Sequence, residues 1–222
     1  MRVLPAILAM VAGYIDAACF LGLSEVFTAH VTGNFAALAS SAVVPSATAV
    51  LRIEVVTAFG VGAAFTRLAT RRLAAFEPIL RRVLLLELAM LALALTGYFA
   101  LGNLPLERLW VAVSAAAAMG AQSALSKLPH SLPSPTTVMT SNYTQWTICV
   151  VDALAAPDAA SGRAARAQLA ALSALLLAFV PGAFAGAYGE ARFGFAALLA
   201  PFLVIACSAV AIHGARRWNL RV

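Results

Sequence analysis

Apolar runs of about 20 residues recur along this chain, and no other feature limits its fold as strongly. Six of them are long enough to cross a hydrocarbon core of about 30 Å as helices, and they cover residues 3–23, 50–67, 83–101, 109–125, 168–188 and 193–213. Only 11% of the residues are charged and 63% are hydrophobic, which is too few polar side chains for a water-soluble surface. We therefore predict an all-α, polytopic membrane protein with about six transmembrane helices in a single domain over residues 1–222.

Two shorter apolar segments, 35–44 and 143–151, lie between these runs. At 1.5 Å per residue they reach only about half of the way across the hydrocarbon core. This length is typical of re-entrant half-helices, which enter and leave the membrane on the same side. Hydropathy alone also permits an alternative in which both segments cross and the chain has eight spans.

The distribution of basic residues favours six spans over eight. With six spans, 12 of the 15 lysines and arginines lie on one side of the membrane, and Arg52, Arg108 and Arg192 lie on the other. The side that is rich in Lys and Arg is normally cytoplasmic. We therefore expect both termini in the cytoplasm.

A weak internal repeat relates residues 1–105 to residues 106–222. The matched residues are Gly13 with Gly120, Thr32 with Thr140, Asn34 with Asn142, Phe59 with Phe179, and Gly62 with Gly182. Each half then contains a span, a half-helix and two further spans. Because three crossings is an odd number, the second copy must be inverted relative to the first, giving a 3+3 inverted repeat. Chance similarity in an alanine-rich chain is the alternative explanation.

Asp16 lies near the middle of the first span, where a carboxylate costs about 2.5–3.5 kcal/mol on insertion scales. Something must compensate this cost: the protein interior, a polar cavity, the N-terminus of a half-helix, or protonation. One hypothesis is that Asp16 changes protonation during a transport cycle. The other is that Asp16 only holds helices together.

Polar residues gather where each half-helix is expected to begin, as Thr32-Gly33-Asn34 and as Thr140-Ser141-Asn142. Thr, Ser and Asn commonly cap the free N–H groups at the start of a helix, so capping is the simpler interpretation. The alternative is that two half-helix N-termini, each with a partial positive charge, meet near the midplane and form a polar site.

Other polar and small residues have structural interpretations. Glu87, one turn into the third span, is expected to pair with a neighbour or to extend toward the arginine-rich interface. Arg52 is expected to mark the outer end of the second span. Small residues four apart permit close packing of helices, and they are Gly60 with Ala64, and Gly182 with Gly186.

The chain resembles a known family at Gly13-Tyr14-Ile15-Asp16-Ala17, at Val26-Phe27 and at Val31-Thr32-Gly33-Asn34. The family is that of the YoaK-like bacterial inner-membrane proteins, a domain of unknown function, and the resemblance in length and span order covers nearly the whole chain. It implies an inner-membrane location and brings no established substrate. The second turn departs from the expected pattern because Ser141 stands where a more permissive glycine is typical.

We expect a transporter or channel for a small polar or ionic solute, without a cofactor or a metal. The expected path residues are Tyr14, Asp16, Thr32, Gly33, Asn34, Gln122, Thr140, Ser141 and Asn142. His30 is a candidate proton relay because imidazole titrates near neutral pH, although a plain interfacial histidine is the alternative.

Other functions remain as alternatives. A structural or partner-binding membrane subunit would use the same polar groups only to satisfy one another. A membrane-embedded enzyme is less expected, since His30, His130 and His213 are far apart and no nucleophile stands beside a base. Nucleic-acid binding is not expected, because the arginines lie between apolar segments instead of forming a basic stripe. The expected partners are the lipid bilayer and a small solute or ion, and a homo-oligomer is compatible with the sequence.

Overall fold

The computed structural model describes residues 3–102, 105–128, 132, 134–156 and 158–219, and these residues form helices and connections without a strand. The all-α prediction is therefore confirmed. The elements are α1 (Leu4–Gly22), α2 (Val31–Ser41), α3 (Ala49–Thr70), α4 (Phe76–Leu101), α5 (Pro105–Leu125), α6 (Met139–Leu154), α7 (Ala159–Phe193), the 3₁₀ turn η1 (Gly194–Leu198) and α8 (Leu199–Asn219).

Four described stretches are long and apolar enough to cross a membrane, as expected of a membrane protein. They are Leu4–Gly22, Ala49–Thr70, Phe76–Leu101 and Ala159–Ile212, the last of which takes in α7 and part of α8. The predicted span 109–125 corresponds to α5, which is not among them. Most side chains of α5 are buried against other helices, so this helix does not need the apolar surface that lipid contact requires.

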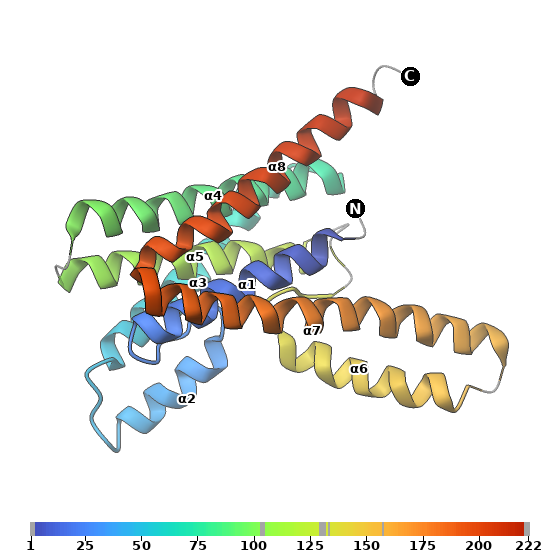
Figure 1. Ribbon diagram of the computed structural model, residues 1–222, viewed down its shortest axis with the longest axis horizontal. Coiled ribbons are helices and arrows are strands. Elements are labelled where there is room, and N and C mark those ends of the chain that lie inside the picture. Colours follow the sequence, from blue (N-terminus) through green and yellow to red (C-terminus); the bar gives the residue numbers. More distant parts are fainter. Residues whose placement is uncertain (1–2, 103–104, 129–131, 133, 157, 220–222) are drawn as a thin grey trace.

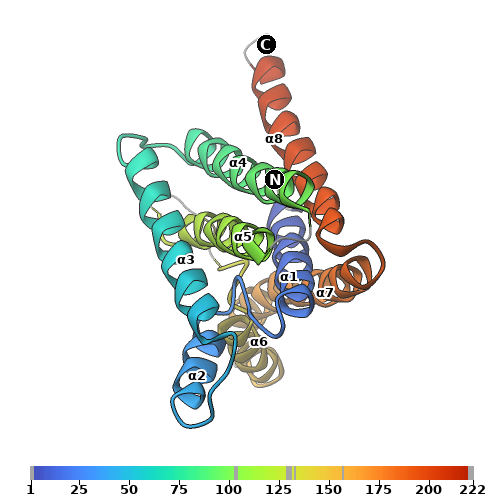
Figure 2. The same ribbon diagram turned by 90° about the vertical axis from the view of Figure 1, so that its left-hand side faces the viewer.

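The helix α5 lies in the middle of the bundle, where α3 and α4 pack against it (Figures 1 and 2). Trp110 of α5 donates a hydrogen bond from its indole N–H to the Leu93 carbonyl of α4, at 2.7 Å. The first helix, α1, packs along α7, and α8 packs on α4. One apolar core therefore runs through α1, α3, α4, α5 and α8.

Glycines set the closest helix contacts. A Cβ atom at Gly62 of α3 would overlap the Ala117 carbonyl of α5, and one at Gly182 of α7 would overlap the Met10 carbonyl of α1. The predicted close packing at Gly182 and Gly186 is thus confirmed, since Gly186 faces the Tyr14 carbonyl in the same way. The expectation for Gly60 is wrong, because nothing lies within 4 Å of a Cβ at that position.

The two short helices begin earlier than predicted. Helix α2 covers Val31–Ser41 instead of 35–44, and α6 covers Met139–Leu154 instead of 143–151. The polar residues that were expected before each helix lie within its first turns. Helix α2 packs on α3, and α6 packs on α7. Their N-terminal ends are turned toward the middle of the molecule, and the two helices run away from one another (Figure 1).

The helix α7 is longer than the predicted span 168–188, since its 35 residues correspond to about 50 Å at 1.5 Å per residue. Its N-terminal part projects beyond the bundle with α6 alongside (Figure 1). The indole N–H of Trp146 on α6 donates to the Ser173 hydroxyl on α7 at 2.8 Å. At its other end α7 stops at Gly194, whose φ of 58° lies in the left-handed region that glycine tolerates best.

Candidate functional site

Asp16 is buried in α1 with 7% of its surface exposed, and its carboxylate is compensated by the chain that leads into α2. Oδ1 accepts hydrogen bonds from the backbone N–H groups of Thr28 at 2.9 Å and Ala29 at 2.7 Å. The Thr28 hydroxyl lies 3.5 Å from the same oxygen. Within the described chain every hydrogen bond to this carboxylate is on Oδ1, so Oδ2 is left without one.

The connection from α1 to Thr28 turns back sharply. The N–H of Glu25 donates to the Phe20 carbonyl at 2.8 Å, which closes the end of α1. Ser24 and Glu25 adopt φ angles of 57° and 67°, a conformation that glycine usually supplies at the end of a helix. This reversal brings the N–H groups of Thr28 and Ala29 back to the carboxylate.

Asn34 closes the turn before α2. Its side-chain N–H donates to the Phe27 carbonyl at 2.6 Å, and its Oδ1 accepts from the N–H of Phe27 at 3.1 Å. Arg52 of α3 also reaches this oxygen, with Nη1 at 3.4 Å. The side chain of Arg52 is buried, and its Nε has no partner among the described residues.

The sequence analysis missed this role of Arg52, which was expected only to mark the outer end of a span. A single arginine one turn inside an apolar helix was the available signal, because a buried guanidinium requires a polar partner. The turn before α2 therefore combines a carboxylate, an amide and a guanidinium.

Of the two interpretations of Thr32-Gly33-Asn34 and Thr140-Ser141-Asn142, helix capping is wrong. The N-cap residues are His30 and Val138, and neither helix has a side-chain cap hydrogen bond. The asparagine side chains reach backward to the preceding loop, so they satisfy loop groups instead of the first helical N–H groups. Thr32 and Thr140 are exposed, and the hydroxyl of Ser141 donates to the Val138 carbonyl at 3.2 Å.

Two other predicted residues lie beside the first turn. A Cβ at Gly33 would lie 3.1 Å from His30 and 3.2 Å from the Phe27 ring, which explains why a glycine fits there. His30 is exposed, and its ring centroid is 5.1 Å from that of Phe27. Its role as a proton relay stays a prediction.

The turn before α6 repeats the asparagine contact, and no charged side chain among the described residues bonds to that asparagine. Asn142 donates to the Pro135 carbonyl at 2.6 Å. Gln122 of α5 donates through Nε2 to the Thr136 hydroxyl at 2.8 Å and to the Leu8 carbonyl at 2.9 Å. The buried Gln122 Oε1 and Thr137 Oγ1 atoms have no hydrogen-bond partner among the described residues. The turn before α6 is thus contacted by the Gln122 amide, whereas the turn before α2 is contacted by the Asp16 carboxylate.

Tyr14 and Glu87, which the sequence analysis singled out, lie away from both turns. The Tyr14 hydroxyl donates to the Ala197 carbonyl of η1 at 3.0 Å, so this side chain belongs to the contact between α1 and the end of α7. Glu87 is fully buried in α4, and neither of its carboxyl oxygens has a partner among the described residues. The expectation that Glu87 pairs or extends to the interface is therefore wrong.

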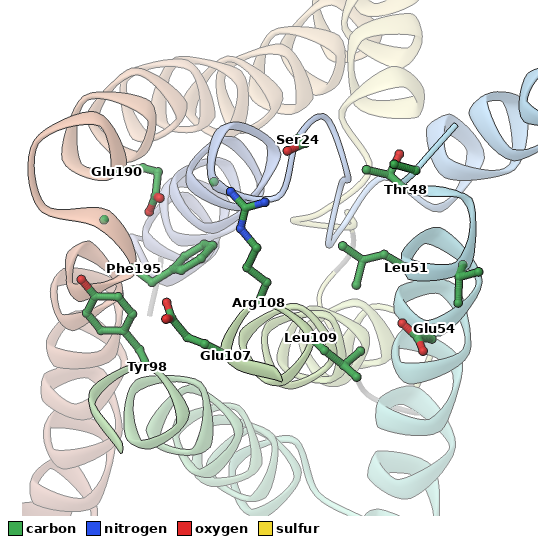
Figure 3. A pocket seen from close by; sticks show the side chains of 14 residues that line it. Ser24, Thr48, Leu51, Glu54, Tyr98, Glu107, Arg108, Leu109, Glu190 and Phe195 are labelled. Atoms are coloured by element: carbon green, nitrogen blue, oxygen red, sulfur yellow. The ribbon is translucent and has the colours of Figure 1, made fainter. Parts of the chain in front are cut away.

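A pocket of about 840 Å³ opens at the end of the bundle where α1 ends and α5 begins (Figure 3). Its charged lining residues are Glu54, Glu107, Arg108 and Glu190. None of the predicted path residues lines it. Sequence reasoning missed this pocket because its walls are the ends of helices that are far apart in the chain.

The described residues contain no group of three or more His, Cys, Asp or Glu side chains that could hold a metal ion. His130 and the side chain of His213 lie outside the described part of the chain.

A search of the curated proteins and a search of the solved structures find no match to this chain. A family model with the description "Protein of unknown function (DUF1275)" matches residues 4–211. The YoaK-like proteins are part of this family, so the resemblance noted from the sequence is confirmed. The matched segment includes both asparagine turns and the pocket. The chain therefore belongs to the DUF1275 family of proteins of unknown function.

Proposed function

We propose that this protein is a six-span transporter or channel that moves a small polar or ionic solute past two broken helices. The observation that carries the proposal is the pair α2 and α6, whose N-terminal ends are turned toward the middle of the molecule (Figure 1). Helix N-termini with free N–H groups attract polar and anionic groups. Broken helices that meet inside a bundle are the usual binding elements of transporters.

Matched contacts in the two halves support the inverted repeat. Gly62 faces the Ala117 carbonyl, and Gly182 faces the Met10 carbonyl, so α3 meets α5 as α7 meets α1. A second matched set is Gly13 against Phe179, and Gly120 against Phe59. Chance similarity of two alanine-rich segments would not be expected to produce the same helix contacts at the same matched glycines.

The position of the basic residues supports six spans with cytoplasmic ends. The start of α1, the end of α8 and the connection between α3 and α4 lie on the same side of the molecule (Figure 1). That connection and its flanking turns carry Arg67, Arg71, Arg72, Arg81 and Arg82. Such a concentration of arginine favours the cytoplasmic side. The short helices α2 and α6 would then be re-entrant.

Asp16 is suited to couple transport to protons. Oδ1 keeps the hydrogen bonds from Thr28 and Ala29, whereas Oδ2 has none within the described chain. A carboxylate held by one oxygen can gain and lose a proton on the other without losing its position. Intramembrane acids of pumps and transporters often carry protons in this manner. The proposal includes no chemical conversion of the solute.

The test is solute flux in liposomes that contain the purified protein, with and without a proton gradient, over a panel of small polar and ionic solutes. We expect wild-type flux of at least one solute, and loss of gradient-coupled uptake in Asp16→Asn. Asp152→Asn is the matched control, since Asp152 is an exposed acid on the short helix α6. Retained coupled uptake in Asp16→Asn would remove Asp16 from the mechanism.

The alternative function is a structural or partner-binding subunit. It is favoured by the fact that the Asp16 and Asn34 side chains already have hydrogen-bond partners within the protein. In that case no solute of the panel would cross, and Asp16→Asn would change only the stability of the protein.

A further inference from the structure

The pocket beside the first turn has the dimensions of a small-molecule site. Its volume of about 840 Å³ lies within the usual range of roughly 300–1,000 Å³ for ligand pockets. Gly22 at its edge is six residues beyond Asp16 on α1, which corresponds to about 9 Å along the helix axis. A ligand in the pocket would therefore lie close to the connection between α1 and α2, whose Thr28 and Ala29 N–H groups bind Asp16.

Negative charge predominates in this pocket. Among its described lining residues are three carboxylates, those of Glu54 of α3, Glu107 of α5 and Glu190 of α7, and one guanidinium, that of Arg108. In Figure 3, Arg108 extends between Glu190 and Ser24, while Glu54 lies on the opposite side. The Oε2 atom of Glu190 is buried and has no hydrogen-bond partner among the described residues. A buried carboxylate oxygen without a donor is costly, so a ligand that supplies a charged N–H group is favoured here.

Aromatic side chains form the wall next to Glu190. The rings of Tyr98 and Phe195 meet edge to face with centroids 6.2 Å apart, and both lie near Glu190 and Glu107 (Figure 3). Aromatic faces attract cations, most strongly where water is displaced. Gly22 permits this arrangement, because a Cβ there would lie 2.5 Å from Glu190 Oε1 and 2.7 Å from the Phe195 ring.

We propose that this pocket binds a small organic amine in its ammonium form. The ammonium group donates to Glu190 Oε2, and the carbon chain lies against Tyr98 and Phe195. Arg108 balances one carboxylate, and Glu54 and Glu190 are two without counting Glu107, so cations are preferred over neutral and anionic molecules of the same size. None of the proposed path residues lines this pocket, so the inference goes beyond the proposed function, and it rests on that function only for the step of crossing the membrane.

The first test compares three probes of equal length on the purified wild-type protein in detergent: n-butylamine, n-butanol and butyrate. Titration calorimetry at neutral pH measures their dissociation constants. We expect n-butylamine to bind at least about tenfold more tightly than the other two, which corresponds to one charged hydrogen bond. Equal affinities for the three probes, or no binding of the amine, would overturn the proposal.

Variants then identify the residues involved. Glu190→Gln should weaken n-butylamine binding about tenfold or more, because the side chain keeps its shape and loses its charge. Arg108→Gln should strengthen the binding by removing the opposing cation. Glu25→Gln is the control, since Glu25 is an exposed acid in the adjacent connection and does not line the pocket. An unchanged dissociation constant in folded Glu190→Gln would reject the site. If that variant does not fold, Phe195→Leu provides the second test, because it removes the aromatic wall and should also weaken n-butylamine binding.

The failures of this proposal and of the transport proposal are separable. Selective binding of n-butylamine without flux of any solute would retain the amine site and reject transport. Flux of a solute without amine binding would reject the amine site alone.

Discussion

The turn before α2 and the turn before α6 are built on the same contact and differ in charge. In each, an asparagine in the helix donates to the carbonyl seven residues earlier: Asn34 to Phe27 and Asn142 to Pro135. The first turn adds the Asp16 carboxylate and the Arg52 guanidinium, whereas the second has the Gln122 amide. Among the described residues, the asparagine contact of the second turn forms without a charged side chain bonded to the asparagine. The charges of the first turn are therefore the better candidates for function.

The largest expected effect comes from removing the side chain that each turn receives from its preceding long helix. Asp16→Ala leaves the N–H groups of the buried Thr28 and the partly buried Ala29 without an acceptor and should lower the free energy of unfolding by about 3–5 kcal/mol. Gln122→Ala removes a neutral amide and should cost about 1–2 kcal/mol. Equilibrium unfolding in mixed detergent micelles measures both values.

Asp16→Asn separates charge from shape in this comparison. Its amide oxygen can still accept from the two N–H groups, so it should lose less stability than Asp16→Ala. Equal losses in Asp16→Ala and Gln122→Ala would mean that the charged turn has no special stability, and the contrast between the halves would fail.

The glycine contacts should behave alike in the two halves, unlike the turns. Gly62→Ala and Gly182→Ala each push a methyl group against a facing carbonyl, and each should cost about 1–3 kcal/mol. Thermal unfolding in detergent measures the loss. Gly60→Ala is the control on the same helix as Gly62, and it should be neutral or stabilising by up to about 1 kcal/mol, since nothing lies near its Cβ. A large loss in one half only would contradict the inverted repeat.

A smaller difference is expected between the two asparagines. Asn34→Ala removes contacts to both backbone groups of Phe27 and to the buried Arg52 guanidinium, and should cost about 2–3 kcal/mol. Asn142→Ala removes one contact to Pro135, which has no N–H to satisfy, and should cost about 1 kcal/mol. Unfolding of the two variants side by side measures the difference. A larger loss of stability in Asn142→Ala than in Asn34→Ala would mean that the Arg52 guanidinium destabilises the first turn and that its contact with Asn34 does not stabilise it.

The sequence predicted the long helices because their length and apolar composition are local properties. It also matched Gly62 with Gly182, which occupy equivalent helix contacts. It misplaced the starts of α2 and α6, because spacing does not tell whether an asparagine side chain bonds forward to the helix or backward to the loop. It selected Gly60 for packing, because a pair of small residues does not show which face of a helix meets a neighbour.

The candidate site was less predictable than the fold. Asp16 and Asn34 were found because polar residues are unusual inside apolar segments. The pocket was not found, because Gly22, Glu54, Glu107 and Glu190 lie on four different helices and meet only through the packing of helix ends. Their mutual approach is a tertiary property that no local pattern records.

The smallest effect concerns α3 and α7, the helices that follow the two short helices α2 and α6. Thr48, the N-cap residue of α3, makes no side-chain cap hydrogen bond. Asp158 Oδ1, in contrast, accepts from the N–H groups of Ala160 and Ser161 at the start of α7, both at 2.8 Å. Asp158→Ala should therefore increase hydrogen exchange in the first turn of α7, and Thr48→Ala should change little at the start of α3. Both effects are measured as amide hydrogen-exchange rates, each divided by the intrinsic exchange rate of the unfolded chain at the same pH.

The stabilisation of α7 by the Asp158 cap should depend on pH. The backbone N–H groups of Ser161 and Ala160 lower the pKa of Asp158 from its ordinary value, because they stabilise the carboxylate. A lowered pKa in the folded state contributes stability above the unfolded pKa of about 3.9, and this contribution is lost as the pH falls through the folded value. The difference between wild type and Asp158→Ala should be constant above about pH 5 and shrink in stronger acid. Asp158→Asn caps the helix without titrating, so its protection should not follow pH; a wild type that also fails to follow pH would show that charge contributes nothing to this cap.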